Sequence, residues 1–383
     1  MGKNIVILGG GVGGLVSANI LRKKLGGEHR IILIDKEEKY LFYPSLLWLL
    51  FGERKAAKIQ RNLNLLTKRG IEFMRGEIEE ISVEKRSVVV DKRDIPYDYL
   101  IISLGAVLAK NYPKNERVFN FYCLSGAELS ADAIKKFQKG KVVILISSLP
   151  FKCPAAPYEL GFLLDSFFKN KNIRQDVELE IYTPELLPMP TAGPDIGNSI
   201  KGMITSRGIK FFPEYKLKSV EEKKIIFENR GEVDFDMLFV VPPHKSPEVV
   251  KNLTEGSGWI SVDRETMKTK FENVYAIGDV TTIKLPGQYK PDKLLNLPKA
   301  GVFAHYQAEV VAENIAREIN GQRPDKRFSG DGYCFLELGD DAAGLARGNF
   351  FALPSPVMRI YRPGRIWHLG KIAFEKWWLW KWF

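Results

Sequence analysis

Two runs of apolar residues near the start of the chain predict a strand, a helix and a second strand. Residues 4–8 form a short buried run, and residues 31–34 form another that ends in Asp35. Between them, Gly9-Gly10-Gly11-Val12-Gly13-Gly14 leads into a helical stretch that continues to about residue 25. A carboxylate about 20 residues past such a turn can hold a ribose 2′-hydroxyl. The pattern therefore predicts a dinucleotide-binding unit, because only glycine lets the backbone close on a pyrophosphate.

A second strand and helix in the middle of the chain lack these glycines. Residues 141–148 have the pattern of a buried strand, and a helix is expected to run to about residue 168. The loop between them, LPFKCPAAPYE, contains a cysteine and three prolines, and the first glycine after it is Gly161. A pyrophosphate could not approach this loop closely, so a nicotinamide donor is not expected.

The composition is that of a globular protein of two or three domains. The chain has 383 residues, of which 45% are hydrophobic and 27% are charged, so it can bury large cores. Residues 1–14 show no secretory or lipidation signal. No run of about 18 uncharged apolar residues predicts a membrane-spanning helix. Three cysteines are too few for a disulfide framework, which favours a chemical role for them.

Charge and histidine content limit the possible partners. The net charge of +11 suits either nucleic acid or an acidic membrane surface. The sequence contains no nucleic-acid-binding motif, so nucleic acid is not expected as a partner. His29, His305 and His368 are isolated, and no Cys or His pair has zinc or haem spacing. No metal site is therefore expected.

Cys153 is a candidate nucleophile. It lies at or just before the expected helix start, since Pro154 or Pro157 suits the first turn of a helix. The positive end of that helix and the neighbouring Lys152 would favour the thiolate, which is the nucleophilic form. The alternative is that Cys153 serves as a small buried apolar residue.

A late strand and helix indicate which dinucleotide is bound. Residues 272–281, ENVYAIGDVT, predict a strand that ends at Gly278 and Asp279, and a helix is expected to begin near Lys299. Together with residues 98–106, DYLIISLGA, these segments resemble the FAD-dependent disulfide reductases, a family of two-domain flavoproteins. The resemblance implies FAD, with the Gly-Asp pair at the ribityl chain and the helix N-terminus at the isoalloxazine. The predicted cofactor-binding residues are Gly9, Gly11, Val12, Gly13, Gly14, Asp35, Lys36, Ile78, Gly105, Gly278, Asp279, Lys299 and Ala300.

The middle loop makes the resemblance more specific. KCPAAPYE, residues 152–159, resembles the Cys-Pro-x-Ala-Pro-x-Glu signature of sulfide:quinone oxidoreductases and of the flavoprotein subunit of cytochrome-linked sulfide dehydrogenases. LFYPSLLWLL, TPELLPMPTAGPDIG and NLPKAGVFAHYQAE are also similar to that family, and the resemblance extends to about residue 371. It implies that Cys153, by motif, and Cys334, by position, meet on one face of the flavin. Cys123 matches a third cysteine in part of the family, with a structural role as its alternative.

The resemblance also implies a chemistry for these cysteines. Hydrosulfide would attack the bond between the two sulfurs and leave a persulfide on one cysteine and a thiolate on the other. The thiolate, by resemblance Cys334, would pass two electrons to FAD, and a further sulfide or thiol would remove the sulfur as polysulfide. Glu159 is a candidate proton relay, with a helix-surface carboxylate as the alternative. His244 is a second candidate, with an exposed loop histidine of no function as the alternative.

The end of the chain has the composition of an interfacial membrane anchor. Residues 358–383 carry a charge of +5, because six cations face only Glu375. Indole rings at the depth of lipid headgroups and lysines that reach past them are typical of such anchors. The residues concerned are Trp377, Trp378, Trp380 and Trp382 with Lys371, Lys376 and Lys381. The tail predicts a peripheral, monotopic membrane protein, with a buried tail helix or a dimer contact as the alternative.

These patterns together predict an α/β protein with two Rossmann-like dinucleotide-binding domains of the disulfide reductase type and a C-terminal membrane-associating segment. The FAD-binding domain is expected at residues 1–107 and 262–320, the second domain at 108–261 and the C-terminal segment at 321–383. The expected function is sulfide:quinone oxidoreductase, acting on sulfide and membrane quinone as a homo-oligomer. The alternatives are a cytochrome-linked sulfide dehydrogenase subunit, a type II NADH:quinone oxidoreductase and a non-enzymatic flavin and thiol redox sensor.

Overall fold

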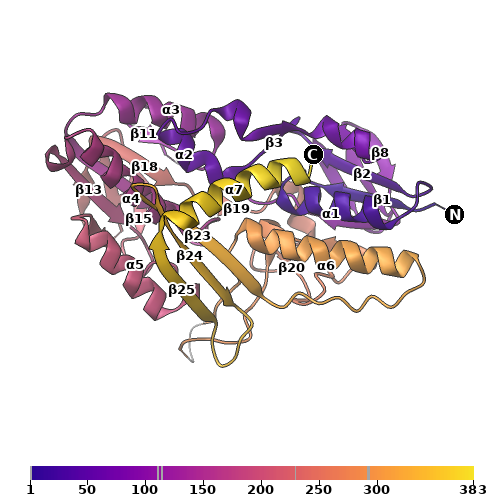
Figure 1. Ribbon diagram of the computed structural model, residues 1–383. Coiled ribbons are helices and arrows are strands. Elements are labelled where there is room, and N and C mark those ends of the chain that lie inside the picture. Colours follow the sequence, from indigo (N-terminus) through magenta and orange to yellow (C-terminus); the bar gives the residue numbers. More distant parts are fainter. Residues whose placement is uncertain (1, 110–111, 114, 229, 291–293) are drawn as a thin grey trace.

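The computed structural model describes residues 2–109, 112–113, 115–228, 230–290 and 294–383 (Figure 1). Its first sheet has five parallel strands in the order β21-β9-β1-β2-β5. Residues 5–8 are fully buried, as expected for a central strand of a parallel sheet that is covered on both faces. Helix α1 (Val12–Lys24) packs on this sheet and against α6 (Gly301–Ile319). The strands are β1 (Asn4–Leu8), β2 (Arg30–Asp35), β5 (Glu72–Arg75), β9 (Tyr99–Ile102) and β21 (Val274–Ala276).

A second sheet of five parallel strands has the order β11-β18-β12-β13-β14. The strand and the helix predicted from the middle of the chain are β12 (Gly140–Ile146) and α4 (Ala156–Asn170). The two Rossmann-like sheets confirm the predicted fold class, whereas the domain boundaries stay predictions. The remaining elements are β11 (Val118–Phe119), β13 (Val177–Tyr182), β14 (Lys210–Phe212), β18 (Met237–Val241), α3 (Leu124–Lys136) and α5 (Pro194–Ser206).

The C-terminal part of the chain contains an antiparallel sheet that the sequence analysis did not predict. Strands β23 (Asp331–Gly339), β24 (Ala342–Asn349) and β25 (Val357–Gly364) pair in chain order, and α7 (Arg365–Lys381) follows directly. β23 packs against α4, and α7 packs against the sheet and runs back toward the first domain (Figure 1).

Helix α7 is an integral part of the fold. The side chain of Asn19 donates a hydrogen bond of 3.3 Å to the carbonyl of Trp382. A continuous hydrophobic core includes Ile5 of the first sheet, Ile144 of the second sheet and Trp378 of α7. Among the described residues, no helix is both long and apolar enough to cross a membrane.

Short elements complete the fold between these parts. Strand β10 pairs with β19 in antiparallel fashion and thereby joins the end of the first domain to the second. The other strands are β3 (Lys39–Leu41), β4 (Gln60–Asn62), β6 (Ile78–Ser82), β7 (Ser87–Val90), β8 (Arg93–Pro96), β10 (Val107–Leu108), β15 (Leu217–Val220), β16 (Lys224–Phe227), β17 (Glu232–Asp234), β19 (His244–Lys245), β20 (Ile260–Ser261) and β22 (Thr281–Thr282). Helix α2 (Leu46–Leu50) and short 3₁₀ helices lie among them, at Tyr43–Ser45, Ala56–Lys58, Leu63–Arg69, Arg174–Asp176, Pro190–Ala192, Glu248–Leu253 and Gly278–Val280.

Candidate active site

The glycine turn after β1 is shaped for a phosphate group. Gly9 has φ +97°, and a Cβ there would lie 2.4 Å from the carbonyl oxygen of Ser103. Gly11 is the N-cap of α1, has no side-chain cap, and a Cβ on it would meet no atom within 4 Å. The first N–H groups of α1, beginning at Val12 and Gly13, are therefore open to an anion. Asp35 is held beside them, because its Oδ2 accepts a hydrogen bond of 2.6 Å from the Gly10 N–H.

The other residues predicted at this end of the cofactor lie on α1, after β2, at the start of β6 and after β9. Gly14 packs tightly within it, since a Cβ there would lie 1.8 Å from the carbonyl oxygen of Gly9. Lys36 is exposed directly after β2, and Ile78 is half-buried at the start of β6. Gly105 follows β9 with φ +68° and has open space at its Cβ position.

The flavin end contains a carboxylate with one buried oxygen that no other described residue contacts through a hydrogen bond. Gly278 has φ +72°, and its N–H donates to Gln307 Oε1 at 2.7 Å. Asp279 is half-buried, and its Oδ1 is shielded from solvent and has no hydrogen-bond partner within the described chain. Burial raises the pKa of Asp279, although Lys299 and Lys152 oppose the rise. An unsatisfied buried carboxylate oxygen fits a ligand hydroxyl, such as one on a ribityl chain.

Positive charge gathers at the N-terminus of α6. The helix begins at Gly301, two residues after the predicted start, and its N-cap Ala300 leaves the first turn without a side-chain cap. The Lys299 ammonium donates hydrogen bonds of 2.7 and 2.9 Å to the carbonyls of Asp279 and Thr281. It also lies 3.4 Å from the centre of the Trp259 ring, and burial lowers the pKa of Lys299 to about 8. This arrangement favours negative charge on a ligand placed before α6.

The cysteine loop is tied to this helix start. The Cys153 N–H donates a hydrogen bond of 2.7 Å to the Lys299 carbonyl, and Lys152 and Lys299 form an isolated parallel bridge. Cys153 has φ +51° and an exposed side chain, and α4 begins at Ala156 with Pro157 in its first turn. The thiol of Cys153 is therefore next to the predicted isoalloxazine site.

Cys153 and Cys334 share the same charged neighbours. Cys334 lies on β23, which packs against α4, and its thiol is 3.1 Å from the Phe335 carbonyl oxygen. Surrounding protein raises the pKa of both thiols, Glu159 raises it further, and Lys371 opposes the rise. Cys153 itself raises the pKa of Cys334, so the fold brings the two sulfurs into one electrostatic environment.

The interpretation that Lys152 and the helix end lower the pKa of Cys153 was wrong. Although the Cys153 side chain is exposed, the protein packed around the thiol and the carboxylate of Glu159 outweigh those effects and raise its pKa. The Lys152 amine instead lies over the ring of Tyr43, 4.2 Å from its centre. Burial raises the pKa of Tyr43, and the charges of Asp35 and Cys123 contribute to the rise.

Cys123 borders the same region from the second domain. It is the N-cap of α3, and its thiol lies 3.7 Å from the Asn120 carbonyl oxygen and 3.8 Å from Ser125 Oγ. Its charge acts on Lys152, as do those of Asp279 and Cys153. Both the redox role and the structural role of Cys123 stay predictions.

The second proton-relay candidate, His244, is buried on β19 and not in an exposed loop. Its Nδ1 lies 2.8 Å from the Pro242 carbonyl oxygen, and its Nε2 has no partner within the described residues. Burial lowers the pKa of His244 to about 3, and the nearby cations Lys152 and Lys299 lower it as well. His244 is therefore neutral at physiological pH.

Glu159 belongs to a buried group of charges that we call the Lys371 cluster, consisting of Glu159, Glu337, His368 and Lys371. The Lys371 ammonium lies 3.3 Å from Glu159 Oε1 and 3.6 Å from Glu337 Oε1. Glu337 Oε2 lies 3.0 Å from Nδ1 of His368. Glu159 also accepts a hydrogen bond of 2.9 Å from the Glu337 N–H, so it is not the helix-surface carboxylate of the alternative interpretation.

Helix α7 presents these charges to the protein interior. Lys371 lies 4.8 Å from the centre of the Trp48 ring, and Glu375 forms a salt bridge of 3.0 Å with Arg54. Trp378 and Trp382 are buried as well. The predicted membrane positions of Lys371, Trp378 and Trp382 are therefore wrong, because these side chains pack inside the fold.

Sequence reasoning missed three members of these charge pairs, namely Glu337, His368 and Arg54. One signal was present in the sequence. His368, Lys371 and Glu375 recur at helical spacing opposite an apolar stripe, which marks two different faces of one helix. Within the described residues, no group of three His, Cys, Asp or Glu side chains is arranged to hold a metal ion.

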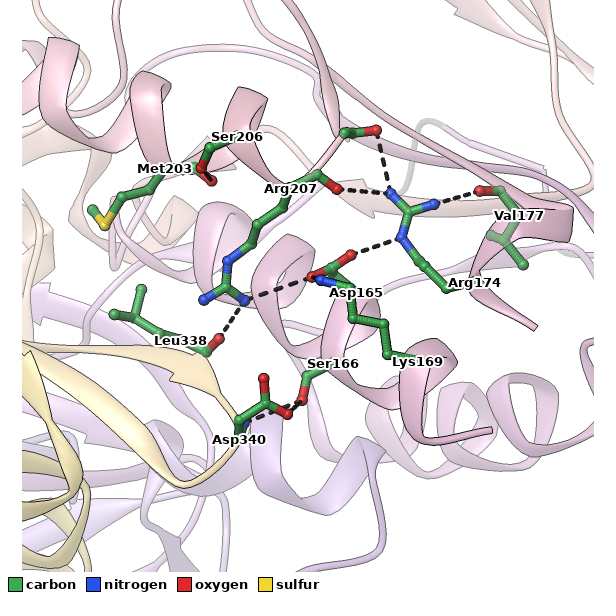
Figure 2. A network of polar contacts seen from close by, with 11 residues as sticks. Asp165, Ser166, Lys169, Arg174, Val177, Met203, Ser206, Arg207, Leu338 and Asp340 are labelled. Atoms are coloured by element: carbon green, nitrogen blue, oxygen red, sulfur yellow. Dashed lines mark hydrogen bonds and ion pairs between the residues drawn. The ribbon is translucent and has the colours of Figure 1, made fainter. Parts of the chain in front are cut away.

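A second polar network holds α4 against β23 further from the cysteines (Figure 2). Asp165 is fully buried and accepts hydrogen bonds of 2.7 Å from Arg174 Nε and from Lys169 Nζ. Arg207 lies 3.7 Å from Asp165 Oδ2 and donates a hydrogen bond of 2.6 Å to the Leu338 carbonyl. Beside it, the Asp340 N–H donates to Ser166 Oγ at 3.1 Å. These contacts fix the strand that carries Cys334 relative to the helix that follows Cys153.

Comparison with known proteins identifies close relatives over the whole chain. The model of the pyridine nucleotide-disulphide oxidoreductase family matches residues 3–149 and 155–307. The sulfide-quinone reductase of Aquifex aeolicus is 31% identical over all of this chain and 91% of that protein. The mitochondrial sulfide:quinone oxidoreductase of Mus musculus is 24% identical over 91% of this chain and 79% of that protein. The X-ray structure of the sulfide:quinone oxidoreductase from Aquifex aeolicus superposes with a TM-score of 0.89 at 27% identity, covering 99% of this chain and 91% of that chain.

Proposed function

Because the chain belongs to the sulfide:quinone oxidoreductases of the pyridine nucleotide-disulphide oxidoreductase family, which are FAD-binding flavoproteins, we propose that Cys153 and Cys334 are its sulfide-oxidising pair. The enzyme oxidises sulfide and reduces a quinone. The observation that carries the role of the cysteines is their common environment beside the Lys299 carbonyl and the start of α6.

The residues around the glycine turn and Asp279 would hold FAD. The open N–H groups of α1 suit its pyrophosphate, Asp35 a ribose and the unpaired Asp279 Oδ1 a ribityl hydroxyl. FAD, when bound, supplies an acceptor for two electrons. Lys299 and the uncapped N-terminus of α6 would stabilise the negative charge that arrives with them.

The cysteine pair divides the oxidation into steps that balance. Hydrosulfide attacks the Cys153–Cys334 disulfide, so that the S–S bond breaks, a persulfide forms on one cysteine and the other leaves as thiolate. A second hydrosulfide removes the outer sulfur of the persulfide and leaves that cysteine as a thiol. The thiol and the thiolate then close again into the disulfide and release one proton and two electrons to acceptors. Glu159 would take the proton, since its charge acts on both sulfurs.

The outer face of α7 supports contact with a membrane surface. Its exposed apolar residues are spaced by three or four positions, which places them on one side of the helix: Ile366, Leu369, Ala373, Trp377 and Trp380. Trp380 is 75% exposed and Ile366 is 70% exposed. Arg365 and Lys376 are exposed beside the stripe, and such cations favour acidic lipid headgroups. We propose that this stripe lies in the membrane interface, where quinone is available, and that the protein assembles as a homo-oligomer.

The alternative of a type II NADH:quinone oxidoreductase has less support. The enzyme of that name from Staphylococcus aureus is 22% identical over 90% of this chain and 90% of that protein. The loop between β12 and α4 has no glycine to admit a nicotinamide dinucleotide, and it carries Cys153 in its place.

An anaerobic titration of the purified yellow protein tests the proposal. Sulfide should bleach the flavin absorbance, NADH should not, and decylubiquinone added afterwards should restore the colour. Cys153→Ser and Cys334→Ser should each keep bound FAD and lose reduction by sulfide. Normal reduction of both variants would refute the role of the pair. A protein that is reduced once but does not turn over with excess quinone would be a redox sensor.

The membrane contact needs a variant that leaves the core intact. Deletion of the chain after residue 370 would also remove Lys371 and Trp378, so it would test folding rather than lipid binding. Changing both Trp377 and Trp380 to serine removes only exposed side chains. We expect at least tenfold weaker binding to anionic liposomes, because each large apolar side chain contributes about 1.5–3 kcal/mol when buried. Leu129→Ser, at another exposed apolar position, should bind as the unaltered protein does.

A further inference from the structure

The Lys371 cluster extends from the two sulfurs to the protein surface. At its inner end, the charges of Glu159 and Lys371 act on both Cys153 and Cys334. At its outer end, His368 has a side chain that is 12% exposed, and its Nε2 lies 4.0 Å from Oδ1 of the exposed Asp341. From Glu159 through Lys371 and Glu337 to His368, each charged group lies within 3.6 Å of the next.

The charges of the cluster balance only when His368 carries a proton. Glu159 is paired with Lys371, which leaves Glu337 with His368 as its cation. A buried unpaired charge costs several kcal/mol, so a proton that arrives at one end of the cluster favours the loss of another from the opposite end. The cluster can therefore pass a proton while its total charge stays the same.

We propose that the Lys371 cluster is the route by which protons from the two sulfurs reach solvent. Glu337 and His368 form its outer end. The inference rests on the proposed oxidation of sulfide. Closing the Cys153–Cys334 disulfide from a thiol and a thiolate releases one proton along with the two electrons that bound FAD accepts. That proton passes to Glu159, the Lys371 ammonium then pairs with Glu337, and His368 gives its proton to solvent.

The surroundings of His368 are mixed in charge. Glu337 on β23 and Asp341 in the following turn bring negative charge to the imidazole, at 3.0 Å from Nδ1 and 4.0 Å from Nε2. Lys371 on the same helix lies 3.6 Å from Oε1 of Glu337, and the ring of Trp48 packs on the imidazole edge to face, with 5.7 Å between the centres. Arg365 lies 3.4 Å from Asp341 and shares its charge. One ring nitrogen of His368 therefore faces a buried carboxylate and the other faces an exposed one.

The test follows protons and electrons together in the full-length, FAD-loaded protein. Sulfide is mixed anaerobically with the protein in weakly buffered, slightly acidic solution, where it is mainly H₂S and its oxidation releases protons. Flavin absorbance reports the electrons and a pH-indicator dye reports the protons. In the unaltered protein both signals should appear in one phase. His368→Gln should slow both at least tenfold, and added imidazole should restore them, as expected when a proton carrier has been removed.

Two further variants make the result decisive. Glu337→Gln should slow both signals without rescue by imidazole, because His368 is still present. His29→Gln should leave both signals unchanged, since His29 lies beside Glu28, 3.2 Å away and outside the cluster. Unchanged rates in His368→Gln, or slow rates that imidazole does not restore, would overturn the route while sulfide still reduces the unaltered flavin. Failure of sulfide to reduce the unaltered protein would instead overturn the proposed function, and the route with it.

Discussion

Replacing Asp165 by asparagine is expected to lower the free energy of unfolding by about 2–3 kcal/mol. Asparagine keeps the volume of the side chain, so no cavity forms, but it presents one oxygen instead of two to a group of cations (Figure 2). The hydrogen bond from Arg174 at 2.7 Å accounts for most of the loss, because the Arg174 side chain is largely buried and Asp165 is fully buried. Lys169, which is half exposed, adds little.

Urea denaturation followed by circular dichroism measures this change, with the exposed pair Arg30–Glu72 as the control. Glu72 accepts two hydrogen bonds from Arg30, at 2.9 and 2.8 Å, in the same chemistry as the buried pair. Both side chains are about half exposed, so Glu72→Gln should cost less than about 1 kcal/mol. Equal losses in the two variants would refute the reasoning, because burial would then not change how much a charged hydrogen bond contributes to the free energy of unfolding.

Two further predictions concern pH and cofactor binding. Burial lowers the pKa of His244 to about 3, whereas a histidine in the unfolded chain titrates near about 6.5, so the unfolded chain binds more protons between these values and stability falls as pH decreases below about 6.5. Unfolding at pH values of about 7 and 5 should therefore show a loss of about 2 kcal/mol that His244→Gln lacks, and an equal loss in both proteins would contradict the prediction. Gly11→Val should fold normally, because a Cβ there meets no protein atom, but it should be purified without yellow colour since the side chain would occupy the phosphate position. Gly14→Val should lower the thermal stability itself, because its Cβ would lie 1.8 Å from the Gly9 carbonyl oxygen.

Local chemistry made the nucleotide-binding elements predictable. The glycines after β1, the acid after β2 and the Gly-Asp pair after β21 act within a few residues of where they stand, so their spacing indicates their geometry. The absence of glycine before α4 is equally local, and it argued against a nicotinamide dinucleotide. The C-terminal sheet was missed because each of its three strands contains three or more charged residues or glycines, which hides the alternation of apolar residues.

The direction of the pKa of Cys153 could not be derived from its neighbours in the sequence. Lys152 is adjacent in the chain, but its amine is directed at Tyr43. The carboxylate that raises the pKa of Cys153 belongs to Glu159 in the first turn of α4. The cation that lowers it belongs to Lys371, more than 200 residues away. Such long-range groups depend on the packing of α7 against β23.

The amino-acid sequence by itself determined that the last helix has two unlike sides. One is apolar and includes Trp377 and Trp380, and the other carries the charges of Lys371 and Glu375 together with Trp378 and Trp382. Periodicity defines the two sides of a helix but not which of them faces the protein. Tertiary structure decided this, because a buried charge must be paired. Inside the fold, Glu159 and Glu337 lie beside Lys371, and Arg54 lies beside Glu375. The apolar side was therefore left outside, where a membrane surface is its proposed partner.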